Sequence, residues 1–233
     1  MTEKDTVIAQ IYAAFGENEH PGENFLQGSF EGSEPFDEVG PFRSKKDWKT
    51  IEAEFLDAHA SALSFFSEAG FRFYLPAYLI ADLNGQLMYA EPLNHLTGGF
   101  SDFSIHLPVG DQEFTVSGGK SSFINPRRYG AATLYDYHRY RLSIFKREEA
   151  GAIVAYLQFK RDFDPEVFDQ AGIDSALNLF WLDRQRSAPS AAELRQYLAG
   201  QEAYLAAVRA QKSHSEPPAP AGSESQPSQG STG

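Results

Sequence analysis

The stretch FRFYLPAYLIADL, residues 71–83, constrains the fold of this chain more than any other segment. Apart from Pro76, most of its residues are aromatic or aliphatic, and proline is well tolerated at the first position of a helix. We therefore predict an extended lead-in followed by a short helix, Pro76–Leu83, which Asn84-Gly85 ends. Both faces of that helix would be apolar, as is typical of a helix in the interior of a protein.

Helical periodicity recurs on both sides of this segment. The helix 2–16 has Thr2 as its cap with Asp5 three residues later, and a helix opened by Ser44 and Asp47 continues through Phe66. Further helices are predicted at 133–140, 147–160, from 174 or 175 onward, and from Ser190 to about 211.

Between residues 86 and 130 the helical period is lost. Apolar and polar residues alternate from Phe103 to Leu107, turn residues follow at 108–111, and a second strand-like run returns at 113–116, which predicts a β-hairpin. The predicted fold class is therefore mainly α: an orthogonal helical bundle around the short buried helix Pro76–Leu83, with a β-hairpin and irregular region inserted at about 86–130.

The net charge and the amino-acid composition restrict the class of protein. The 233 residues carry a net charge of −12 and contain no cysteine, which excludes disulfides and thiolate metal sites. The negative charge disfavours nucleic acid and anionic membranes as partners, and no apolar run is long enough to span a membrane. We expect one cytoplasmic helical domain, residues 1–210, followed by a disordered, proline- and serine-rich tail at 211–233.

Opposite charges are concentrated in two segments. Residues 17–38 are acidic and include several phenylalanines that would pack on the body, whereas residues 127–147 are basic with tyrosines interleaved. Arginine and tyrosine together suit the binding of phosphate or of an acidic partner, but also internal pairing with the acidic segment. The candidate binding residues are Arg127, Arg128, Tyr135, His138, Arg139 and Arg141.

Catalytic and metal-binding patterns are weak. His59 falls on the apolar face of its helix, as core histidines do, and His95, His106 and His138 lack the close spacing of a zinc motif. The carboxylate pair Glu148-Glu149 is interpreted as solvated. We therefore expect no metal, no cofactor and no catalytic residue.

Three stretches support a resemblance. GFRFYLPAYLIADL at 70–83, and FKREEAGAIVAYLQF at 145–159 with ALNLFWL at 176–182, resemble a bacterial family of unknown function whose members carry a G-F-R-Y-Y-L-P-A-Y-L core and a later E-E-x-x-A-I-x-x-F-L helix. The similarity covers about residues 44–83 and 143–183, and the family implies no activity and no site residues.

Two functional hypotheses remain. The first is a non-catalytic protein-interaction or regulatory domain, which is favoured by the acidic surface and the absence of a catalytic motif. The second is an enzyme or a binder of a small anionic ligand, with a pocket between the helical body and the 86–130 insertion that would use Arg127, Arg128, Tyr135 or His138.

Overall fold

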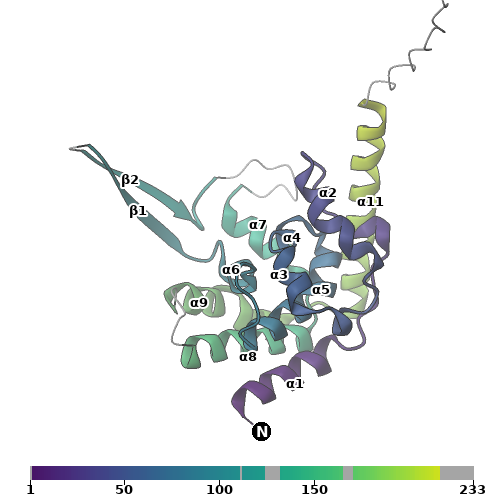
Figure 1. The fold of residues 1–233 in the computed structure, drawn as a ribbon, viewed down its shortest axis with the longest axis horizontal. Helices are drawn as coiled ribbons and strands as arrows, with labels where there is room; N and C mark the ends of the chain where they lie inside the picture. The colour runs from purple at the N-terminus through teal and green to yellow at the C-terminus, as the bar shows by residue number, and fades with distance from the viewer. Residues whose placement is uncertain (1, 111, 124–131, 165–169, 216–233) are drawn as a thin grey trace, which may run out of the picture.

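The computed structural model describes residues 2–110, 112–123, 132–164 and 170–215. Within them the protein is mainly helical, with one antiparallel hairpin that stands away from the helical body (Figure 1), which confirms the predicted fold class. The elements are α1 Glu3–Phe15, α2 Glu34–Val39, α3 Ala53–Ala58, α4 Ala62–Phe65, α5 Glu68–Leu83, α6 Pro92–Thr97, β1 Asp102–Val109, β2 Gln112–Gly119, α7 Leu134–Arg141, α8 Arg147–Phe163, α9 Gln170–Ala176, α10 Leu182–Ser187 and α11 Ala191–Ser215. Short 3-10 turns lie at Glu23–Phe25, Gly40–Ser44, Trp48–Thr50 and Leu142–Ile144, and a π-helical turn lies at Leu177–Trp181.

The helix α5 is the centre of the core. It packs against α1, α3 and α6, and Leu79 has no solvent-exposed surface, while Ile80 is partly buried against the core. The prediction of a buried helix here is correct, but its start is wrong: the helix begins at Glu68, so residues 71–75 are helical and Pro76 lies inside the helix.

The early start of α5 has a local cause. The Ser67 hydroxyl accepts a hydrogen bond from the Gly70 amide at 2.9 Å and so caps the helix nine residues before the proline. Pro76 removes one helical hydrogen bond, because it has no N–H to donate, but burial of nearly every other side chain in α5 supports the helix around it.

The predicted helix over 44–66 is wrong in its continuity. Asp47 caps only a 3-10 turn, and α3 and α4 are separate short helices because the backbone leaves the helical region at Glu52 and at His59. The Tyr78 hydroxyl donates to the carbonyl oxygen of His59 at 3.0 Å, so a contact with α5 takes up a carbonyl that a longer helix would have used.

The acidic segment 17–38 and the residues after it pack on the body, as expected, and contain short helices within the predicted loop. Leu26 and Phe42 are fully buried. Gly70 lets the segment approach, because a side-chain carbon at this position would lie 2.7 Å from the Leu26 carbonyl oxygen.

The helix α1 carries the predicted capping box between Thr2 and Asp5, and it packs along α8. The last helix, α11, begins after a second capping box, in which the Glu193 carboxylate accepts from the Ser190 amide at 2.8 Å. It continues to Ser215, beyond the expected end near 211, and the rest of the predicted tail, 216–233, lies outside the described residues.

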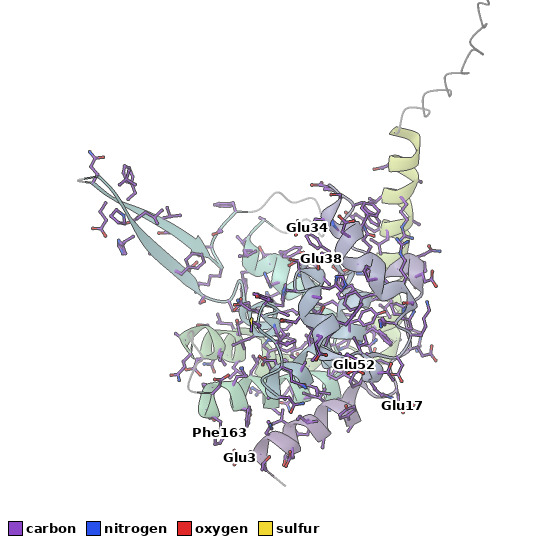
Figure 2. The ribbon with its side chains drawn as sticks, viewed as in Figure 1. Glu3, Glu17, Glu34, Glu38, Glu52 and Phe163 are labelled. Atoms are coloured by element: carbon purple, nitrogen blue, oxygen red, sulfur yellow. The ribbon has the colours of Figure 1, made fainter. Side chains whose placement is uncertain are left out.

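The strands β1 and β2 form a regular antiparallel pair, with Phe103 opposite Gly118 and Leu107 opposite Phe114. Gly110 takes a positive φ of 63° in the turn between them, a conformation that glycine adopts without strain. Side chains are densely packed in the helical body, whereas the hairpin stands apart from it (Figure 2). None of the described helices is both long enough and apolar enough to cross a membrane.

Candidate functional site

The predicted binding residues do not form one exposed cluster. Arg127 and Arg128 lie outside the described residues. Arg139 is exposed, and its guanidinium carbon lies 5.4 Å from the centre of the Tyr135 ring, within the same helix α7. Tyr135, in contrast, is half-buried and packs against the core and the Phe100 ring.

Arg141 is not available. Only 6% of its surface is exposed, its guanidinium donates a hydrogen bond to the Leu63 carbonyl oxygen, and it stacks over the Phe71 ring at 4.6 Å. Arg141, one of the candidate binding residues, is therefore buried and does not lie on the surface. Its charged group instead ties α7 to α4 and α5 in the core.

His138 serves mainly as a packing group. Its ring fills the space beside Gly98 and Gly99, where a side-chain carbon on Gly99 would lie only 2.6 Å from the imidazole. Gly99 has a positive φ of 78°. The backbone therefore bends closely around the ring, and His138 does not line an open pocket between α7 and the insertion in the way that the ligand-binding hypothesis needs.

His95 and His138 are both held neutral by their surroundings. Burial, with the positive charge of Arg141 adding to its effect, lowers the pKa of His95 to about 3 and the pKa of His138 to about 4. Across the described parts of the chain, no group of three histidine or carboxylate side chains is arranged to hold a metal ion.

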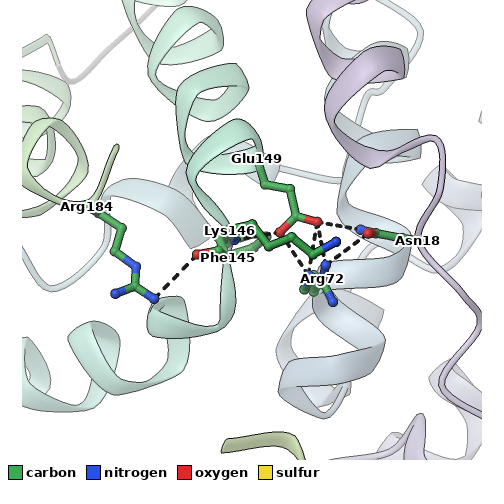
Figure 3. Close-up of polar contacts among 6 residues, drawn as sticks. All are labelled: Asn18, Arg72, Phe145, Lys146, Glu149 and Arg184. Atoms are coloured by element: carbon green, nitrogen blue, oxygen red, sulfur yellow. Dashed lines mark hydrogen bonds and ion pairs between the residues drawn. The ribbon is translucent and has the colours of Figure 1, made fainter. Parts of the chain in front are cut away.

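A buried ion pair joins the two segments that carried the sequence resemblance (Figure 3). The Arg72 guanidinium, from α5, donates to the Glu149 carboxylate of α8 at 2.7 Å, and the Glu149 side chain is fully buried. Asn18 donates to the same carboxylate at 2.8 Å and accepts from Arg72 at 2.9 Å. The interpretation of Glu149 as solvated is therefore wrong.

The Glu149 carboxylate also caps its own helix, because it accepts from the Lys146 amide at 2.8 Å. One carboxylate thus neutralises a buried arginine and also accepts a hydrogen bond from a backbone amide at the start of α8. A polar hollow of about 430 Å³ opens beside this cluster, and its lining includes Arg72, Lys146 and His20 together with Glu17, Glu19 and Glu202. The Arg72 charge is already neutralised by Glu149, so the hollow has no excess of positive charge to attract an anion.

His20, at the edge of the hollow, is part of the structural framework. Its Nδ1 accepts from the Gly22 amide at 3.0 Å, so its Nε2 carries the proton and donates to the Tyr74 hydroxyl at 3.1 Å. Burial lowers the pKa of His20 and raises that of Tyr74, which keeps both groups neutral. The pair therefore anchors the segment 17–38 on α5.

The hairpin presents two faces of different character. In its register one face is apolar and the other polar. The apolar side chains are each between 45% and 61% exposed: Phe103, Leu107, Val109, Phe114 and Val116. We call these five residues the apolar hairpin face.

The polar face of the hairpin is satisfied by its own cross-strand contacts. His106 lies 3.1 Å from the Glu113 carboxylate, and the Ser104 and Ser117 hydroxyls are 3.1 Å apart. One face is therefore internally paired while the other exposes aromatic and aliphatic groups to solvent. The alternation that revealed the hairpin in the sequence also contained this asymmetry, but only the structure shows that no part of the described body covers it.

Comparison with known proteins bears on the first part of the chain. Residues 3–94 match the model of a family of unknown function, DUF6714. The match contains α5 and the acidic segment, and it confirms the expected relationship to a family without a known activity. Comparisons with curated proteins and with solved structures found no match.

The DUF6714 segment ends before the hairpin, and it contains Asn18 and Arg72 but not their partner Glu149. Neither the apolar hairpin face nor the second half of the buried ion pair therefore falls within the matched residues.

Proposed function

We propose that this protein is a non-catalytic protein-interaction domain of the bacterial cytoplasm, and that a protein partner covers its apolar hairpin face. The observation that carries the proposal is the contrast between the two faces of β1–β2: one is internally paired, and the other exposes Phe103, Leu107, Val109, Phe114 and Val116. Contiguous exposed apolar groups of this kind are typical of interaction surfaces.

The physical state of the hairpin supports this interpretation. A two-stranded hairpin without a covering layer is at best marginally stable in water, because it buries too little apolar surface. A partner that covers the apolar face would remove these side chains from water and so stabilise the strands and the complex together. Its outer strand edges could also pair with a strand of the partner.

Charge favours a protein over a membrane or a nucleic acid. The whole chain carries a net charge of −12, and the charged groups of the hairpin include Asp102 in β1 and Glu113 in β2, with Lys120 directly after β2. Surfaces that bind anionic lipid or phosphate are rich in lysine and arginine. An apolar surface of a protein, with a neutral or basic rim, matches the hairpin better. The absence of cysteine fits a reducing compartment such as the cytoplasm.

Photo-crosslinking from the two faces of one strand tests the proposal. A benzoylphenylalanine is placed at position 114 on the apolar face, or at position 115 on the polar face, in the full chain produced in its source cells. We expect a discrete adduct with one protein from position 114 and none from 115, because their side chains point to opposite sides of the strand.

The adduct should disappear when Leu107→Thr and Val116→Thr are added, since these changes make the same face polar. The matched control adds Ser104→Thr and Ser117→Thr on the polar face and should leave the adduct unchanged. Equal adducts from positions 114 and 115, or no adduct from either, would show that the apolar hairpin face is not a docking surface.

A further inference from the structure

A second surface, far along the chain from the hairpin, is hollowed between α7 and α11. The hollow has a volume of about 450 Å³. Its lining residues are Tyr140, Glu193, Gln196, Tyr197, Gly200, Gln201 and Tyr204. All except Tyr140 follow one face of α11, and we call this surface the tyrosine groove.

Gly200 keeps the middle of the groove open. It lies within α11 between Tyr197 and Tyr204, and a side-chain carbon at this position would meet no atom within 4 Å. Glycine inside a helix costs roughly 1 kcal/mol relative to alanine. No contact within the described chain explains why glycine occupies this position. A ligand that lies across the helix between the two tyrosine rings would explain it, because a larger side chain would block its path.

Gln201 supplies the polar group of the groove. Its Oε1 accepts from the Ala69 amide at 3.0 Å, which fixes the side chain against the start of α5. Only 6% of the residue is exposed. Its Nε2 is buried and has no hydrogen-bond acceptor among the described residues. An unpaired buried donor is unfavourable, and a carbonyl oxygen brought in by a ligand would satisfy it.

Tyrosine rings beside an amide donor define the chemistry of the ligand. Polyproline II segments present flat apolar rings that pack on aromatic side chains, and their backbone carbonyls are free to accept hydrogen bonds. The Tyr197 hydroxyl already donates to the Tyr140 carbonyl oxygen at 3.0 Å, which holds the two sides of the groove together. The groove thus offers ring faces and one donor, the two features that such a segment needs.

We propose that the tyrosine groove binds a proline-rich segment, and that its occupant is Pro217–Pro220 of a second copy of this chain. That segment reads Pro-Pro-Ala-Pro and follows directly after α11 in the sequence. This segment belongs to the same chain but lies outside the described residues.

Chain length decides that the segment comes from a second copy. Ser215, the last residue of α11, is eleven residues beyond Tyr204, which corresponds to about 17 Å along a helix axis. Pro217 is two residues further on, and two extended residues reach at most about 7 Å. A chain with an intact α11 therefore cannot return Pro217 to its own groove, whereas the segment of another molecule can enter it.

The test uses the full chain and three variants. In the first, Pro217, Pro218 and Pro220 are replaced by alanine. In the second, Gly200→Leu fills the groove, a change that the open space at this position and the higher helix propensity of leucine should allow without loss of folding. The third, Pro227→Ala, is the control, because it removes a tail proline outside Pro217–Pro220.

Sedimentation velocity over a range of concentrations should show self-association of the full chain and of the Pro227→Ala variant, and a monomer for the first two variants. A synthetic peptide spanning residues 215–223 should bind the triple-alanine variant. Its affinity should be at least about tenfold weaker once Gly200→Leu is added, while the thermal melting temperature does not fall.

Two results would overturn the proposal. Equal peptide binding with and without Gly200→Leu, or no binding to either protein, would show that the groove does not take the proline-rich segment. A full chain that stays monomeric at all concentrations while the peptide binds would show that a second copy is not the occupant.

Discussion

At the scale of single residues, substitutions of Glu149 are expected to have a large effect on stability. Breaking a buried ion pair by removing one partner typically costs 3–5 kcal/mol, since the other charge stays buried without compensation. We therefore expect Glu149→Leu and Arg72→Met each to lower the free energy of unfolding by about that amount. The double variant should lose much less than the sum of the two, because neither charge remains. Urea unfolding followed by circular dichroism measures all three.

The exposed ion pair of Lys46 and Glu23, at 2.9 Å, is the matched control. Lys46→Met and Glu23→Leu should leave the unfolding curve unchanged within error, since exposed pairs contribute little. Additive losses at positions 72 and 149, or losses no larger than in the control, would contradict the structural role of the buried pair.

The sequence contains both residues of this pair but does not show that they meet. Arg72 stands within an apolar run, which is a signal that a charged group is taken into the core with a partner. The partner could not be chosen from the sequence, because Glu148 and Glu149 are neighbours on α8 and point about 100° apart. Only the placement of α8 against α5 decides which of them turns inward.

At the scale of elements, α5 and the hairpin should differ most in local stability. The helix is buried along almost its whole length, whereas the two strands pair only with each other within the described chain. Local opening requires little free energy where few apolar contacts hold an element. Hydrogen exchange followed by mass spectrometry should therefore show rapid exchange in β1 and β2 and strong protection in α5.

Binding of a partner to the apolar hairpin face should slow exchange in the strands and leave α5 unchanged. Leu107→Thr should scarcely alter global stability, while Leu79→Ala in α5 should cost roughly 3–5 kcal/mol, as deletions in a close-packed core do. Protection of the free hairpin equal to that of α5 would mean that the apolar face is already covered.

The elements that the sequence predicted well are those whose signal is local. The alternation from Phe103 to Leu107 and the turn after it specify a hairpin wherever it lies. The continuous helix over 44–66 was predicted from its period, yet the chain breaks at His59, whose carbonyl binds Tyr78 in α5. Likewise, Pro76 marks a helix start in an isolated peptide, but burial and the Ser67 cap extend α5 before it.

At the scale of the whole molecule, the folding unit is larger than the segment that matches DUF6714. The helix α1 packs on α8, and Asp82 of α5 accepts from the Tyr156 hydroxyl at 2.7 Å and pairs with Lys160 at 3.1 Å. With Arg72 and Glu149, these contacts join residues 3–94 to α8 through charged groups as well as apolar ones. The first half of the chain therefore depends on α8 to complete its core.

The histidines of α6 and α7 make the stability of this unit depend on pH. In the unfolded chain His95 and His138 would titrate near the usual pKa of about 6.5. In the folded protein their pKa values are lowered to about 3 and about 4 by burial, with Arg141 adding to the effect. Below pH 6.5 the unfolded state therefore binds protons that the folded state does not. The free energy of unfolding must then decrease as the pH is lowered.

The fall should approach 1.4 kcal/mol per pH unit for each histidine, or about 2 to 3 kcal/mol per unit for both, between pH 6 and pH 5. Urea unfolding at half-unit steps measures the slope. His138→Gln should reduce the slope by about one histidine's share, close to 1.4 kcal/mol per pH unit, whatever its effect on stability at pH 7.5, and His106→Gln on the exposed hairpin serves as the control. His20 is half-buried and also has a lowered pKa, but it contributes equally to all three proteins and does not affect the difference. The interval lies above the usual range of carboxylate titration, so an unchanged slope in His138→Gln would mean that its imidazole is not held neutral in the fold.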